Sequence, residues 1–181
     1  MVATIKENNN SPFKTVDVDP ITLDLIENSL KNARHEMDAT LFRTAMSPGI
    51  REQGDAFPLI ADHNGAMLAG QFGSFIQGFL DGYDGDIEEG DVFWLSDPYT
   101  CDGAVSHAND WLVLMPIYRE KRLVGWGAMF GHMTDVGGMV PGSLPTSAIS
   151  IFQEGIRIPP IKLYRKGEKQ DDILKIVLHQ C

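Results

Sequence analysis

The sequence is poor in cysteine, in positive charge and in long apolar runs, and each scarcity argues against a class of protein. Two cysteines, Cys101 and Cys181, cannot form a disulfide framework, so we expect a reducing, cytoplasmic location. Lys and Arg number 15 against 25 Asp and Glu, and the formal net charge of −10 repels nucleic-acid phosphates and anionic lipids. No apolar run approaches the roughly 18–20 residues needed to cross a bilayer. We therefore expect neither a nucleic acid nor a membrane as a partner.

A nucleotide-binding signature is also missing. The glycine-rich segments Gly125-Trp126-Gly127 and Gly137-Gly138 match neither a phosphate-binding loop nor a dinucleotide fingerprint. We therefore expect no ATP site and no other cofactor-binding loop in this chain.

The composition is that of a globular domain, because 43% of the 181 residues are hydrophobic and 22% are charged, enough to bury a core. Residues 1–18 are polar and predict a flexible lead-in. Asp19 can then cap a helix whose first residue is Pro20. Apolar residues recur every three or four positions from there to about Ala45, which predicts a long amphipathic helix. A hydrophobic stripe of this kind needs another element to cover it.

Two hairpins are predicted beyond this helix. Residues 56–61 and 66–69 flank a polar turn that ends in Asn-Gly. Residues 111–118 and 123–130 flank a charged turn, and we expect these two strands to pair antiparallel. A turn centred near 120–121 would place Trp111 opposite about Phe130 and Asp110 opposite about Gly131.

The expected fold class is α+β, with the long N-terminal helix packed on a mostly antiparallel sheet. Residues 91–95 predict a further strand, and residues 74–81 a short helix. Loops dominate from about residue 137, and residues 171–179 predict a final helix. Because the sequence stops within that helical pattern, we expect residues 19–181 to be the N-terminal portion of a larger domain.

The residues most typical of a metal site are His107, Asp110 and His132. The hairpin brings the loop that carries His107 and Asp110 to the end of the sheet where His132 lies. Two imidazoles and one carboxylate can hold Zn²⁺, Mn²⁺ or Fe²⁺ and leave positions open for water or substrate. The alternative is that these histidines only bond the backbone at the strand ends.

Further carboxylates lie in the same or adjacent loops, and they could complete the site or orient its histidines. Aspartates also populate turns because they bond their own backbone, which is the alternative for each of them. Ser106 is next to His107, but no oriented base follows at a recognisable spacing, so we do not expect it to be a nucleophile. The carboxylates concerned are Asp55, Asp97, Asp102 and Asp135.

Several motifs in one frame carry a resemblance to a known family. In chain order they are Asp97-Pro98-Tyr99, His107-Ala108-Asn109-Asp110, Gly131-His132-Met133-Thr134-Asp135-Val136-Gly137-Gly138, Pro141-Gly142-Ser143 and Glu154-Gly155-Ile156-Arg157-Ile158-Pro159-Pro160. They resemble hydantoinase B, a family that also includes part of ATP-dependent 5-oxoprolinase and the metal-carrying subunits of acetone and acetophenone carboxylases.

The resemblance implies roles for particular residues. His107, Asp110 and His132 match the family's metal positions, and Zn or Mn is the expected ion. A carboxylate from the segment after the first helix normally joins them, either Glu52 or Asp55. The resemblance also matches Asp135 to the acid that follows the second histidine, as a ligand of a second ion or a proton carrier, and either Asp135 or Asp55 could move the proton.

The resemblance also implies a function. In this family a hydantoinase A-type partner uses ATP to activate the substrate carbonyl, and the B-type subunit completes the reaction at its metal. We therefore expect a hetero-oligomeric enzyme that opens a cyclic amide such as a hydantoin, 5-oxoproline or a lactam. Two alternatives remain, an ATP-dependent ketone carboxylase and a non-catalytic assembly module.

Overall fold

The computed structural model describes residues 17–71, 75–100 and 102–181. Most of the predicted lead-in, Cys101 and the first residue of the helix predicted at 74–81 lie outside these ranges. The helices are α1 Pro20–Thr44, α2 Pro48–Gln53, α3 Ile76–Gly82 and α4 Asp171–Gln180, with a short 3₁₀ helix η1 at Ile151–Gln153. The strands are β1 Ala56–Asp62, β2 Met67–Ala69, β3 Val92–Leu95, β4 Asp110–Arg119, β5 Arg122–His132, β6 Ile161–Arg165 and β7 Glu168–Lys169.

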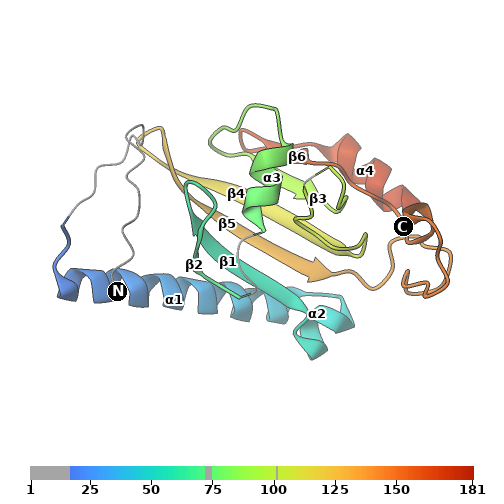
Figure 1. The fold of residues 1–181 in the computed structure, drawn as a ribbon, viewed down its shortest axis with the longest axis horizontal. Coiled ribbons are helices and arrows are strands. Elements are labelled where there is room, and N and C mark those ends of the chain that lie inside the picture. Colours follow the sequence, from blue (N-terminus) through green and yellow to red (C-terminus); the bar gives the residue numbers. More distant parts are fainter. Residues whose placement is uncertain (1–16, 72–74, 101) are drawn as a thin grey trace, which may run out of the picture.

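The described strands form one sheet in the order β2-β1-β5-β4-β3-β6-β7, and every neighbouring pair is antiparallel. Helix α1 runs along the β1 and β2 side (Figure 1), and α3 and α4 pack on opposite faces of the sheet. This arrangement confirms the α+β class and the antiparallel sheet.

Helix α1 begins where its sequence signals place it. The Asp19 carboxylate accepts hydrogen bonds from the backbone N–H of Ile21 and of Thr22, both at 3.1 Å, and Pro20 takes the first helical position, which needs no donor. No residue of α1 is buried. Met37 and Leu41 are half-buried, whereas Ile26 is 47% exposed, so only the second half of the predicted apolar stripe is covered.

The β4–β5 hairpin is the element that determines the register of the site. Glu120 and Lys121 both have positive φ and form a two-residue turn, and the register shifts by one residue between Ile117 and Tyr118. Asp110 therefore lies opposite His132, and Trp111 lies opposite Gly131. The register predicted from the turn alone is wrong by one residue at this end, because the bulge adds a residue to β5.

The hydrophobic core is divided between the two faces of the sheet. Alternate residues of β4 point to opposite faces, so Leu112 and Leu114 pack with Trp126 under α3, whereas Trp111 and Val113 pack with Trp94 under α4. Each fully buried apolar side chain of this size contributes roughly 1.5–3 kcal/mol to stability.

Three elements differ from the sequence-based prediction. Helix α2 and strands β6 and β7 occupy segments for which no regular structure was predicted. Strand β6 pairs with β3 through Trp94 and Ile161, residues far apart in sequence, and no local pattern reports such a contact. Within the described ranges no helix combines the length and the apolar character needed to cross a membrane.

Candidate metal centre

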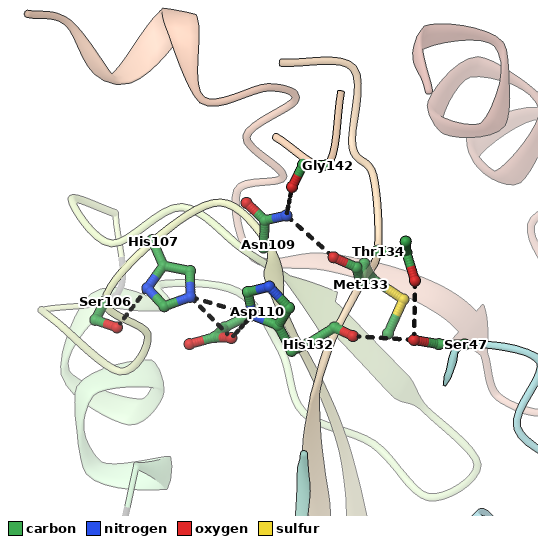
Figure 2. Close-up of polar contacts among 9 residues, drawn as sticks. All are labelled: Ser47, Ser106, His107, Asn109, Asp110, His132, Met133, Thr134 and Gly142. Carbon is green, nitrogen blue, oxygen red and sulfur yellow. Dashed lines mark hydrogen bonds and ion pairs between the residues drawn. The ribbon is translucent and has the colours of Figure 1, made fainter. Parts of the chain in front are cut away.

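The candidate metal centre is formed at one end of the β4–β5 hairpin (Figure 2). Asp110 is the first residue of β4 and His132 is the last residue of β5, so the register of the hairpin places them opposite each other. His107 precedes β4 in a tight turn, in which the Asp110 N–H donates to the His107 carbonyl at 3.1 Å. Local folding therefore brings together three side chains that span 26 residues of sequence.

The ligand atoms of these three residues lie close enough to share one ion. His107 Nε2 and His132 Nδ1 each lie 3.2 Å from Asp110 Oδ1, and the two nitrogens are 3.3 Å apart. Ligands on one zinc ion at bonds of about 2.0–2.1 Å are themselves separated by about 3.0–3.4 Å. The donor set, two imidazoles and a carboxylate, and its spacing both fit a divalent transition metal.

Both histidine ligands have a neighbouring serine as a hydrogen-bond partner. Ser106 Oγ lies 2.9 Å from His107 Nδ1, which leaves Nε2 of that ring facing Asp110. On the other strand, Ser47 Oγ donates to the His132 carbonyl at 3.4 Å. A partner on the ring itself, as Ser106 is for His107, fixes ring orientation and raises the basicity of a metal ligand. Ser47 instead holds the backbone at His132.

Asn109 connects the two ligand loops. It is fully buried, and its Nδ2 donates to the carbonyls of Met133, at 3.0 Å, and Gly142, at 3.3 Å (Figure 2). Its Oδ1 is buried and has no hydrogen-bond partner among the described residues. This side chain therefore links the segment that carries His107 and Asp110 to the segment that follows His132.

The three ligands line a cavity of about 600 Å³. This is within the range of small-molecule sites. Aromatic and carboxylate side chains share its walls. The lining residues are Gln53, Asp55, Phe57, His107, Asp110, Phe130, His132 and Leu144.

The two candidates for a fourth ligand lie in different environments. Asp55 lines the cavity, and its carbonyl accepts the His132 N–H at 3.1 Å. Glu52 lies on α2 with a side chain that is 64% exposed, and it pairs with Arg51 at 3.2 Å. Neither carboxylate is within the His107–Asp110–His132 group, and of the two only Asp55 faces the same cavity.

Asp135 lies outside the group and organises its own loop. Its carboxylate accepts from the N–H of Gly142 at 3.1 Å, from Ser143 Oγ at 2.8 Å and from the N–H of Gly137 at 3.0 Å. These hydrogen bonds, that from Gly142 foremost, lower the pKa of Asp135 below its usual value. A carboxylate held ionised in this way suits a structural acceptor better than a proton carrier.

The other two carboxylates predicted near the metal site, Asp97 and Asp102, lie outside it. Asp97 Oδ1 accepts from the Tyr99 N–H at 3.0 Å and lies 3.6 Å from the Arg157 guanidinium. Asp102 occupies a turn position with φ of 47°. Neither belongs to the ligand group or lines the 600 Å³ cavity.

The apolar wall of the cavity is not among the sequence-based predictions. Phe130 could have been found, because it lies two residues before His132 and therefore on the same face of β5. Phe57 faces Phe130 across the β1–β5 pairing, with ring centroids 4.9 Å apart. That pairing joins distant segments and has no local signal.

Comparisons with known proteins agree with this architecture. The family model for hydantoinase B/oxoprolinase matches residues 19–181. The chain is 36% identical over 170 residues to caprolactamase subunit beta of Pseudomonas jessenii, a match that covers 89% of this chain and 29% of the relative. It is 30% identical over 132 residues to the acetophenone carboxylase delta subunit of Aromatoleum aromaticum, covering 68% of this chain and 19% of the relative.

A solved structure supports the same assignment. The crystal structure of the ATP-dependent caprolactamase from Pseudomonas jessenii matches with a TM-score of 0.78 at 32% identity, covering 90% of this chain and 29% of that one. The chain thus spans less than a third of the length of these relatives. The motifs, the fold and the matches together show that the chain belongs to the hydantoinase B/oxoprolinase family.

Proposed function

We propose that this chain supplies the metal centre of an ATP-dependent enzyme complex that opens a cyclic amide. The observation that carries the proposal is the convergence of His107, Asp110 and His132 on the wall of a ligand-sized cavity. The similarity to a caprolactamase subunit supports a lactam, hydantoin or 5-oxoproline as substrate. As a B-type subunit it would work with a hydantoinase A-type subunit that uses ATP, in a cytoplasmic hetero-oligomer.

The residues of the candidate site have different roles in this proposal. His107 Nε2, His132 Nδ1 and Asp110 Oδ1 would hold Zn or Mn, and the ion when bound supplies Lewis acidity and lowers the pKa of bound water. Ser106 and Asn109 orient the ligand loops. Asp55, on the cavity wall, is the carboxylate placed to bind as a fourth ligand or to accept a proton. Glu52 and Asp135 are the weaker candidates, because their contacts lie outside the cavity.

A second candidate function keeps the same site. The similarity to an acetophenone carboxylase subunit favours a reaction in which bicarbonate-derived CO₂ joins a ketone enolate. Both reactions need an activated carbonyl and an electrophilic centre, so the ligands alone do not separate them. The identity of the substrate and the requirement for bicarbonate distinguish the two reactions.

The test is a reconstitution of the complete complex with its ATP-using subunit. A lactam and a hydantoin are supplied with ATP, with and without bicarbonate, and the ring-opened acid is quantified. We expect ring opening that is independent of bicarbonate and is lost in His107→Ala. ATP turnover that requires both a ketone and bicarbonate would support the carboxylase. A fully assembled complex without any turnover would indicate that the chain has a non-catalytic assembly role.

A further inference from the structure

The cavity beside the metal ligands has one apolar wall and one acidic wall. Phe57 and Phe130 form the apolar wall with Leu144, whereas Asp55 and Asp110 supply carboxylates. Phe130 is the centre of an aromatic row, because its ring also contacts Phe75 edge-on with centroids 5.2 Å apart. An apolar portion of a ligand can therefore contact rings while its polar atoms face the metal ligands.

A second hollow of about 270 Å³ adjoins the first. Asp110 and Phe130 line both of them. The other walls of the smaller hollow are Phe75 and the segment Gly103–Ser106. Phe130 thus lines two hollows that also share the Asp110 carboxylate.

The carboxylates of Asp55 and Asp110 give the walls of the two hollows negative charge. Among the described residues that line the two hollows, none is Lys or Arg. A divalent ion at the ligand group would be offset by the Asp110 and Asp55 carboxylates. A further carboxylate carried by a substrate would therefore enter a partly desolvated site without a cationic side chain to pair with, which is unfavourable.

From these observations we infer that the site selects cyclic amides with an uncharged hydrocarbon ring and discriminates against those that carry a free carboxylate. Phe130 is the specificity-determining residue, because its ring lines both hollows. This inference rests on the proposed cyclic-amide function and narrows its substrate class to neutral lactams and neutral hydantoins, with 5-oxoproline disfavoured.

The experiment uses the complete complex with its ATP-using subunit and measures kcat/KM for caprolactam and for 5-oxoproline. We expect a preference of at least tenfold for caprolactam. Gln53→Arg adds a cation to the cavity wall and should raise kcat/KM for 5-oxoproline and reduce the preference. The matched control Asn64→Arg adds the same charge in the exposed β1–β2 turn and should leave the preference unchanged.

Phe130 is tested separately, with metal content as the measure of an intact site. Phe130→Ala should raise KM for caprolactam about tenfold, and Phe130→Leu should keep most of the affinity because it keeps an apolar wall. Equal or better turnover of 5-oxoproline by the native complex would overturn the inference while leaving the cyclic-amide function standing. Turnover of neither amide would overturn both.

Discussion

Asn109 and Met133 form two hydrogen bonds with each other at the end of the β4–β5 hairpin where the metal ligands lie. The Asn109 side-chain amide donates to the Met133 carbonyl at 3.0 Å, and the Met133 N–H donates to the Asn109 carbonyl at 2.8 Å. Because Asn109 lies between His107 and Asp110, and Met133 follows His132, this pair fixes the distance between the two ligand loops (Figure 2).

Replacing Asn109 should therefore weaken the metal site without removing a ligand. Asn109→Ala leaves the Met133 and Gly142 carbonyls without their donor, and we expect a loss of about 1–3 kcal/mol in the free energy of unfolding. Metal affinity should fall about 10- to 100-fold. Urea unfolding and chelator competition measure the two effects, with Asn64→Ala, in an exposed turn, as the control. Unchanged affinity would show that the loops hold their spacing without this link.

Ser106 offers a narrower test of ligand orientation. Its hydroxyl contacts His107 Nδ1 at 2.9 Å, so Ser106→Ala should let the ring rotate and reduce metal affinity about tenfold. The fold should be unaffected, because Ser106 is exposed. Chelator competition is the measurement, and Ser29→Ala on the exposed face of α1 is the control. Equal affinities in the two variants would mean that His107 needs no orienting partner.

The part of the site that the sequence could predict is the part built by local folding. His107, Asp110 and His132 converge because one hairpin carries them, and a turn with two strands is visible in sequence. The bulge in β5 is not visible, because its extra residue, Val124, is an ordinary strand residue opposite the Ile117–Tyr118 step, and the register predicted from the turn differs by one residue for that reason.

The rest of the site depends on contacts between distant segments. Phe57 reaches Phe130 through the β1–β5 pairing, which no local pattern encodes. Asp135 is expected at the site because it lies in a loop near the ligands and matches the family's acid after the second histidine. In the structure its carboxylate accepts hydrogen bonds from the N–H groups of Gly137 and Gly142, a contact within its own loop.

Ser143 tests the structural role of the Asp135 loop. Its buried hydroxyl oxygen accepts from the N–H groups of Val136, at 2.9 Å, and Gly138, at 2.8 Å, and donates to Asp135. Ser143→Ala leaves those two amides unpaired and should cost about 1–3 kcal/mol of unfolding free energy. Exposed Ser147→Ala is the control in the same urea titration. A loss no larger than the control's would contradict this role.

Asp91 should make stability depend on pH. Burial alone opposes its ionisation, but hydrogen bonds from Lys162 Nζ, at 2.8 Å, and from the N–H groups of Lys166 and Glu88 lower its pKa below the usual 3.8. Because the folded-state pKa is the lower one, ionised Asp91 stabilises the fold above pH 3.8, and this contribution is lost as the pH falls further.

The same pair predicts a large mutational effect. Asp91→Asn leaves Lys162, whose side chain is 10% exposed, without its counter-charge and should cost about 3–5 kcal/mol at neutral pH. The matched control Asp171→Asn removes an exposed carboxylate from a 2.9 Å pair with Lys169 and should change stability by less than about 1 kcal/mol. Urea unfolding across the acid range checks both, and parallel pH curves for native protein and Asp91→Asn would refute the assignment.

The most direct test of the central claim is metal content by elemental analysis, with chelator competition for affinity. We expect close to one equivalent of Zn or Mn in the native chain and in His35→Ala, which alters an exposed histidine on α1. His107→Ala and His132→Ala should keep the native circular dichroism and lose at least tenfold in affinity. A folded native chain that binds no metal after loading, or that binds it equally in all four proteins, would contradict a metal centre at His107, Asp110 and His132.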